Sequence, residues 1–479
     1  MILSLLVSIL VPQLIAFLFL FLMWPRQGPL SSLALKLCLA AGMGLGIFSC
    51  NYFVQLLVLG PSRSTFISIE VALLAILSAI LFYTVKSRKN SPADEDAVAP
   101  LPKSRLRLLL SIVFLVALVS ALVSFIFITL KRPHGEWDAW AVYNMKARFL
   151  VRAGEYWKDL YSAPLYWTGT DYPLLIPTTI AGIWTLMGRE SVAVPPLVAL
   201  LFVLGTAGAA TSALSILRSN SQGLLAGLLL LCTPFFVAHG ANQYSDIPIG
   251  FFFLATFVLL SFHQRSPAGD SRFLFLAGLS AGLAAWTKNE GSLFALAIIV
   301  ARFATMVPRH GLKAYLREMM FFGAGLIPVM AVVLYLKMGL GQPNGLLSPT
   351  EGPPFMAKVR DVARYGIIAR AFFEQAFIFG DWAVPIVPIL GGYLLLVGTA
   401  IDKRDKPSVL LVFTVLGIML AGYSVIYVLS PRDVHWHVVT SLNRLCSQLW
   451  PSFLFGFFLM ARTPEGSLIK GNVSAPSSA

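Results

Sequence analysis

The sequence predicts an all-α polytopic membrane protein, and its composition and apolar patterning support this class. Hydrophobic residues make up 57% of the 479 residues and charged residues only 12%, whereas soluble domains carry about twice that share of charge. Mean hydropathy is +0.78. Apolar runs of roughly the 17 to 25 residues that cross a bilayer recur from end to end. These runs leave no room for a soluble domain of ordinary size.

We count about 14 apolar runs, several of them short against the length that a crossing needs. In chain order they cover residues 2–23, 34–59, 66–85, 108–130, 173–187, 192–217, 223–238, 247–262, 273–287, 292–307, 320–338, 383–401, 408–429 and 449–461. Lys and Arg in short loops favour the cytoplasmic side, which places 86–107 inside and 131–172 outside. With this orientation the first run starts outside and the last run ends inside, so the number of crossings must be odd. We therefore expect about 13 transmembrane helices and one partial or re-entrant helix, either 173–187 or 223–238.

The chain divides into four predicted parts. They are an N-terminal three-helix membrane module (1–85), a cytoplasmic linker (86–107), a membrane domain (108–462) and a cytoplasmic tail (463–479). The net charge of +14 lies in short loops beside apolar runs, so we expect no nucleic-acid partner. The four cysteines show no paired spacing, which argues against a disulfide framework or a cysteine metal site.

The loop 131–172 is the candidate for chemistry because charges, aromatics and amides gather there. Trp137, Trp140 and Tyr143 have the spacing of an amphipathic helix at the membrane interface. Asp138 lies between the tryptophans, where a carboxylate suits proton abstraction or hydroxyl binding; the alternative is a solvated residue at a helix start. Its basic residues, including Lys146 and Arg148, oppose the positive-inside trend, and an anionic ligand would explain them.

Two further aspartates stand before apolar runs. Asp171 and Tyr172 precede Pro173, a pattern typical of a helix start capped by Asp171. The secondary interpretation is that both residues also line the site. Tyr244 and Asp246 belong to a polar patch before another run. Asp246 is either an N-cap residue or part of a shared cavity with Asp138.

Late in the chain, ionisable residues sit close to apolar runs. Lys288 and Glu290 either neutralise one another or form part of a site, with Lys288 as a phosphate ligand. Arg444 either snorkels to the interface or binds phosphate. His437 is a candidate cavity residue, but its spacing from His435 is poor for zinc.

These motifs together resemble the GT-C superfamily of membrane glycosyltransferases, in its protein mannosyltransferase and aminoarabinose transferase-like branch. The resemblance spans roughly residues 108–460. It rests on these segments in this order: Trp137-Asp138-Ala139, Asp171-Tyr172-Pro173-Leu174-Leu175, Tyr244-Ser245-Asp246-Ile247-Pro248, Gly282 to Lys288, and Asn443-Arg444-Leu445. The chain departs from the pattern at Leu174, which replaces a second proline, and in the three apolar runs that precede the usual first helix.

The resemblance implies a GT-C-like core with an amphipathic outer loop and transfer of a sugar from a polyprenyl-phosphate donor, with inversion. Asp138 would act as general base or orient the acceptor, with Asp246 as a second catalytic residue. Lys288, Arg444, Lys146 and Arg148 would bind the donor phosphate. The acceptor would be a lipid, a glycan or a protein. No cofactor is required, although a divalent metal between Asp138 and Asp246 is an alternative.

The implied location is a bacterial inner membrane, or the endoplasmic reticulum of a eukaryote, with the site on the non-cytoplasmic side in contact with membrane lipid. A transporter or flippase of lipid-linked sugars is the alternative function, because it would also need many helices and basic cavity residues.

Overall fold

The computed structural model describes residues 2–24, 33–86, 105–266, 269–341 and 354–465. Most of the predicted linker and tail therefore lies outside the described residues. The long α-helices are α1 (Ile2–Met23), α2 (Leu33–Leu59), α3 (Arg63–Lys86), α4 (Arg105–Lys131), α7 (Val194–Leu217), α10 (Asp246–Arg265), α11 (Ser271–Thr287), α12 (Asn289–Tyr335), α14 (Val362–Ile378), α16 (Lys406–Leu429) and α17 (Val434–Met460). In the part of the chain that is described, strand pairing is limited to an isolated bridge between Thr399 and Ala461. The predicted all-α class is confirmed.

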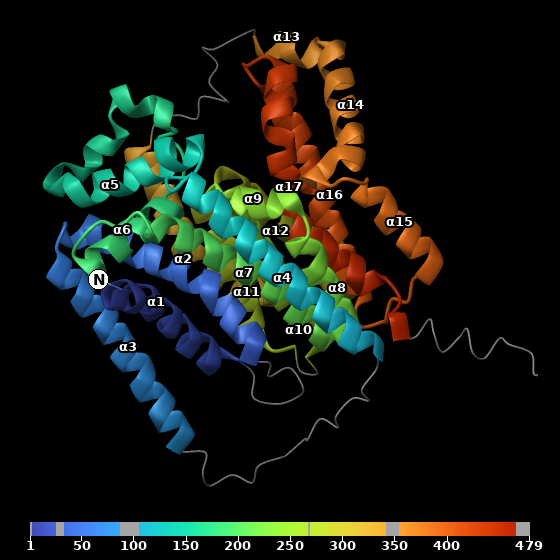
Figure 1. Cartoon of the computed structure of the whole chain (residues 1–479), viewed down its shortest axis with the longest axis horizontal. Helices are drawn as coiled ribbons and strands as arrows, with labels where there is room; N and C mark the ends of the chain where they lie inside the picture. Colours follow the sequence, from blue (N-terminus) through green and yellow to red (C-terminus); the bar gives the residue numbers. More distant parts are fainter. Residues whose placement is uncertain (1, 25–32, 87–104, 267–268, 342–353, 466–479) are drawn as a thin grey trace, which may run out of the picture.

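Shorter helices connect these elements. The α-helices are α5 (Met145–Arg152), α6 (Leu175–Met187), α8 (Asn220–Leu231), α9 (Pro234–Ala241), α13 (Phe355–Arg360) and α15 (Ile386–Val397); the π- and 3-10 turns are η2 (Ala139–Asn144), η3 (Gly154–Tyr161), η4 (Ala163–Thr168), η5 (Leu336–Leu340) and η6 (Phe379–Asp381). In Figure 1, α5 and α13 lie at one end of the bundle, and the C-terminal end of α3 lies at the other.

Among the described residues, eight helices are long and apolar enough to cross a membrane, or ten if each of two bent pairs is one span. The pairs are α8 with α9, bent by 60°, and α14 through η6 with α15, bent by 90°. The chain is thus a polytopic membrane protein, while the predicted number of about 13 crossings stays a prediction. Both candidates for the partial helix are irregular: α6 has 13 residues, and 223–238 contains the bend between α8 and α9.

Helix α12 is a hairpin of two antiparallel segments. Gly311 has a φ of 79° and interrupts the helix. Arg302 forms an ion pair with Glu318, and Tyr315 donates a hydrogen bond to the carbonyl of Ile299 at 3.3 Å. Residues 16 apart would lie about 24 Å apart in a straight helix, so the chain must fold back at Gly311. The two apolar runs predicted at 292–307 and 320–338 correspond to these two segments.

Helix α2 packs at the centre of the bundle through small residues. A Cβ atom on Gly42 would lie 2.1 Å from the ring of Phe251 in α10, and one on Gly46 would lie 2.8 Å from Leu283 in α11. Glycine at these positions lets neighbouring helices approach closely. By contrast, α3 and α4 lie on the outside of the bundle (Figure 1), with only 11% and 17% of their apolar windows buried.

Candidate functional site

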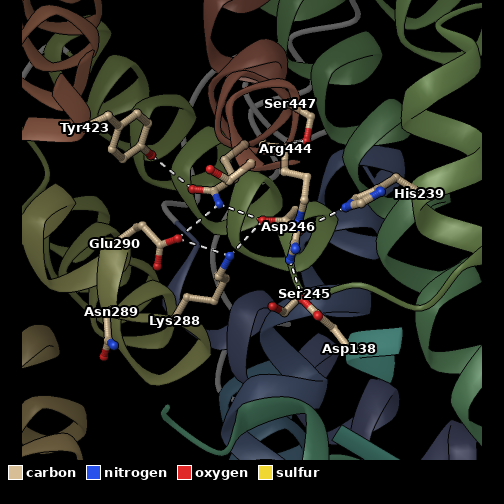
Figure 2. A network of polar contacts seen from close by, with 12 residues as sticks. Asp138, His239, Ser245, Asp246, Lys288, Asn289, Glu290, Tyr423, Arg444 and Ser447 are labelled. Atoms are coloured by element: carbon tan, nitrogen blue, oxygen red, sulfur yellow. Dashed lines mark hydrogen bonds and ion pairs between the residues drawn. The ribbon is translucent and has the colours of Figure 1, made fainter. Parts of the chain in front are cut away.

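The polar side chains of one site come from helix ends, from a break between two helices and from the interior of α17. Asp138 immediately precedes η2, and Asp246 is the first residue of α10. Lys288 lies in the break between α11 and α12, where its extended backbone ends one helix and begins the next. Arg444 and Gln448 lie one turn apart on α17. Figure 2 shows the side chains of Asp138, Asp246, Lys288 and Arg444 pointing toward one another.

Asp246 is the centre of this network and is fully buried. Its Oδ1 accepts hydrogen bonds from Lys288 Nζ at 2.8 Å and Gln448 Nε2 at 2.7 Å. Its Oδ2 contacts Arg444 Nε at 3.1 Å and His239 Nε2 at 3.0 Å. A buried carboxylate is tolerated only when it is paired and hydrogen-bonded, and these contacts meet that requirement. Asp246 is therefore held in one orientation.

Arg444 connects this buried carboxylate to an accessible one. Its Nη2 donates to Asp138 Oδ2 at 2.5 Å, while its Nε binds Asp246. The guanidinium lies 4.6 Å from the centre of the Tyr244 ring, a cation–π arrangement. The Asp138 side chain is 24% exposed and that of Asp246 is fully buried. Of the two aspartates, Asp138 is thus the one that a substrate could reach.

Glu290 extends the network toward α16. It forms an ion pair with Lys288 at 3.1 Å and accepts a hydrogen bond from Gln448 Nε2 at 3.4 Å. The other end of the Gln448 amide accepts a hydrogen bond from Tyr423 at 3.0 Å (Figure 2). Lys288 therefore touches two carboxylates, which combines both sequence-based alternatives: it neutralises Glu290 and it belongs to the site.

Three residues of the network were missed from the sequence: His239, Gln448 and Tyr423. His239 is stacked between Phe235 and Tyr244, with ring centroids 4.7 and 4.3 Å away. Gln448 directly precedes the apolar run 449–461 and His239 directly follows 223–238, so both were recognisable in principle as polar residues next to a membrane span. Tyr423 lies inside the run 408–429, where a tyrosine is a weaker signal.

A second polar cluster forms beside the network. Asn289 donates to Asp171 Oδ2 at 2.9 Å, and Lys337 in η5 donates to Asn289 Oδ1 at 2.5 Å. Lys337 also contacts the backbone carbonyl of Asp171 at 3.5 Å, and Lys146 donates to that of Gly169 at 2.6 Å. The side chains of Asp171 and Lys146 thus belong to this second cluster and do not contact Asp246. Lys337 was not singled out in the sequence.

The phenol groups of Tyr143 and Tyr172 lie close to these charges. Tyr143 is buried and shares a hydrogen bond of 2.5 Å with Ser245, next to Asp246. Burial raises the pKa of Tyr172 to about 12; Lys288 opposes this, and Glu290, Asp171 and Asp138 add to it. Tyr172 therefore lies within reach of charges from both the network and the second cluster.

Other predicted site residues lie apart from the network. Arg148 pairs with Glu190 at 3.7 Å and contacts His134 at 3.5 Å. Trp137 and Trp140 pack edge to face at 4.7 Å and remain largely exposed. His437 contacts the Ser430 hydroxyl at 2.9 Å.

The residues do not fit a divalent metal between Asp138 and Asp246. The guanidinium of Arg444 binds both carboxylates and so supplies the positive charge that a metal would bring. Within the described ranges, no three or more His, Cys, Asp or Glu side chains are grouped to hold a metal ion. We therefore derive no step through a metal.

Comparison with known proteins bears on the same segments. Residues 171–336 match the family model described as dolichyl-phosphate-mannose-protein mannosyltransferase. This match, over about a third of the chain, supports a GT-C-like membrane glycosyltransferase. The matched region contains Asp171, Asp246 and Lys288, whereas Asp138 and Arg444 lie outside it. No curated protein and no solved structure matches the chain.

Proposed function

We propose that this glycosyltransferase moves a sugar from a polyprenyl-phosphate donor to an acceptor hydroxyl at the non-cytoplasmic face of the membrane. The observation that carries the proposal is the Asp138–Arg444–Asp246 bridge. It presents one partly exposed carboxylate, Asp138, on a fixed and buried support. A positioned and partly exposed carboxylate is what general-base catalysis on a hydroxyl needs.

The reaction is a single displacement. The acceptor hydroxyl gives its proton to Asp138, and its oxygen forms a bond to the anomeric carbon of the donor sugar. The bond between that carbon and the phosphate oxygen breaks, and the electron pair leaves with the polyprenyl phosphate. Attack opposite to the leaving group inverts the anomeric carbon. Cationic side chains near the site stabilise the charge that develops on the departing phosphate.

Arg444 and Asp246 serve as positioning residues for this step. Arg444 binds Oδ2 of Asp138, so the proton can be taken up by the other carboxylate oxygen. Asp246 holds Arg444 from the buried side. Replacing either residue would leave an uncompensated charge next to Asp138.

The arrangement of the bundle supports the proposed sidedness. The loop residues of α5 and the helix α13 lie at one end, and the basic end of α3, at Lys86, lies at the other (Figure 1). The positive-inside rule places the Lys86 end in the cytoplasm. A bacterial inner membrane, or the endoplasmic reticulum, would be the corresponding compartment.

The first prediction concerns Asp138→Asn in membranes supplied with a lipid-linked sugar. We expect sugar transfer to fall by about 10²- to 10⁴-fold, the usual contribution of a general base, because the amide cannot take up the proton. Thermal unfolding in detergent should change little, since the amide can still accept a hydrogen bond from Arg444. Transfer is measured as labelled sugar in the acceptor fraction.

The matched control is Asp159→Asn, an exposed aspartate of the same loop, which should keep full transfer. Wild-type protein that moves lipid-linked sugar across the membrane of a vesicle but transfers no sugar to an acceptor would instead indicate a transporter.

A further inference from the structure

Two lysines near the site contact no carboxylate oxygen among the described residues, although the charge of Asp171 acts on both. Lys146 is buried and donates to a backbone carbonyl, and the half-buried Lys337 donates to an amide and a backbone carbonyl. Within the described ranges neither forms an ion pair. Lys288 and Arg444, in contrast, each contact two carboxylates. A buried charge without a counterion is costly, so Lys146 and Lys337 suit an anionic ligand.

The two lysines converge on one short segment. Lys146 binds the carbonyl of Gly169 at 2.6 Å, and Lys337 binds that of Asp171 at 3.5 Å. Two residues of extended chain span only about 7 Å. The adjacent residue, Tyr172, feels the charges of Lys288 and Asp138 as well as that of Asp171. An anion held by these lysines would therefore lie beside residues 169–172.

An apolar groove runs along the same helices. It has a volume of about 400 Å³ and lies between α2, α3, α11 and α12. Its lining is mainly aliphatic and includes Ile47, Val54, Val58, Ile69, Leu283 and Val332. On α2 it extends from Ile47 to Leu59, about 18 Å at the helical rise. The neighbouring α3 is largely exposed on the outside of the bundle (Figure 1), where membrane lipid would cover it.

The helices that line the groove continue to the cations. In α11 the lining residue Leu283 comes five positions before Lys288, and in α12 Val332 comes five positions before Lys337. Five helical residues rise about 7.5 Å. Helices α11 and the second segment of α12 run in the same direction, since Gly278 and Gly282 of α11 pack against Phe322 and Val329. Both cations therefore lie beyond the same end of the groove.

We propose that the groove holds the isoprenoid tail of the donor and that Lys337, together with Lys146, binds its phosphate. This inference rests on the proposed function and assigns the donor site of that reaction. A branched aliphatic chain with one phosphate matches an apolar groove with Lys337 beyond one end and Lys146 on the same short segment. A free phosphate would use the lysines alone, and a lipid without a phosphate would use the groove alone.

The assignment divides the cations into two sets with different tasks. Lys288 and Arg444 keep the carboxylates Asp246 and Asp138 in place. Lys146 and Lys337 hold the phosphate and receive the charge that develops as the bond to the sugar breaks. The N-terminal helices α2 and α3 then belong to the donor site, because they form one wall of the groove.

The second prediction concerns donor binding by full-length protein in detergent. Lys337→Gln should raise KM at least tenfold for both long-chain and short-chain donors, because both carry the phosphate. Lys337→Arg keeps the positive charge and should have a KM close to that of the wild type. Val54→Trp, which fills the groove from a side chain that is 40% exposed, should raise KM for the long-chain donor only. The control Val71→Trp lies on the outer face of α3 and is 59% exposed; it should match the wild type.

Competition by donor fragments identifies the ligand. Farnesyl phosphate should inhibit wild-type transfer far better than farnesol, inorganic phosphate or dioleoyl phosphatidate. Equal inhibition by phosphatidate would overturn the isoprenoid assignment. Unchanged KM values in Lys337→Gln and Val54→Trp, with an active wild type, would overturn the donor site as a whole. If the wild type transfers sugar from no lipid-linked donor, the proposed function itself fails. Where Val54→Trp does not fold, Val58→Trp provides the same test.

Discussion

Arg444 joins two carboxylates, Asp138 and Asp246, that lie 306 and 198 positions away in the chain. Its planar guanidinium can bind both at once, because its N–H groups form a rigid fork. A lysine, with one compact charge, could not reproduce both contacts. Arg444, which the sequence predicted to bind phosphate, thus contacts a carboxylate on each side. Its proposed task is to position Asp138.

Lys146 is the residue whose charge is most sensitive to pH. Burial lowers its pKa to about 7, although the nearby Asp171 opposes this. A lysine with a lowered pKa is charged below that value and neutral above it. The charge that would bind the donor phosphate is therefore present at pH 6 and mostly lost at pH 8.

The third prediction follows from this titration. Between pH 6 and pH 8, KM for the lipid-linked donor should rise about tenfold, because the charged fraction of a group with a pKa near 7 falls by about that factor. The donor is a phosphodiester and keeps its charge over this range. Lys146→Arg should abolish the pH dependence of KM, since arginine stays protonated. A wild-type KM that is constant with pH would contradict the role given to Lys146.

At the scale of elements, helix α2 determines how the bundle closes around the site. It contacts α10 through Gly42 and α11 through Gly46, and these two helices carry Asp246 and lead to Lys288. Ser49 of α2 also accepts a hydrogen bond from Trp286 at 2.8 Å, two residues before Lys288. Displacing α2 would therefore move the helix ends that hold the charged residues.

The fourth prediction is that Gly42→Ala destabilises the protein. The added methyl group would meet the ring of Phe251 at 2.1 Å, and overpacking of this kind costs about 1–3 kcal/mol. Thermal unfolding in detergent should shift to lower temperature, and transfer activity should fall with the loss of folded protein. In Gly417→Ala, the control, the new methyl group meets no atom within 4 Å. A stability of Gly42→Ala equal to that of the control would show that α2 does not pack as described.

At the scale of the whole molecule, orientation in the membrane decides which face receives substrate. The bundle carries the loop 131–172 and its exposed tryptophans at one end, and tryptophan is enriched at membrane interfaces. Asp405, at the turn before α16, pairs with Arg265 at 2.5 Å and Arg218 at 3.5 Å. Some basic loop residues therefore have structural partners, so topology has to be measured directly.

The fifth prediction is that Ser162→Cys reacts with an impermeant thiol reagent in intact cells. Ser162 lies in the loop between η3 and η4, which we place on the non-cytoplasmic face. Lys403→Cys, in the exposed loop before α16, should react only after lysis. The wild type provides the background, because Cys232 is exposed. Protection of Ser162→Cys until lysis would reverse the orientation.

The sequence by itself determined the all-α membrane class and the order of most apolar helices. Hydropathy and periodicity are local properties, so a run such as 108–130 shows its nature without reference to the rest of the chain. The same locality explains where prediction fell short. The helix α14 lies between the predicted apolar runs 320–338 and 383–401, in a stretch whose charged residues interrupt any apolar run.

Only the tertiary structure decided which charges are paired. Asp138, Asp246, Lys288 and Arg444 were all proposed from sequence as site residues, but nothing local indicated that Arg444 would bind both aspartates. Nor did any local pattern show that Lys337 would contact the backbone carbonyl of Asp171 and not its carboxylate. The physical reason is that the energy of a buried charge depends on what surrounds it in space. In this protein those surroundings come from helix ends hundreds of residues apart.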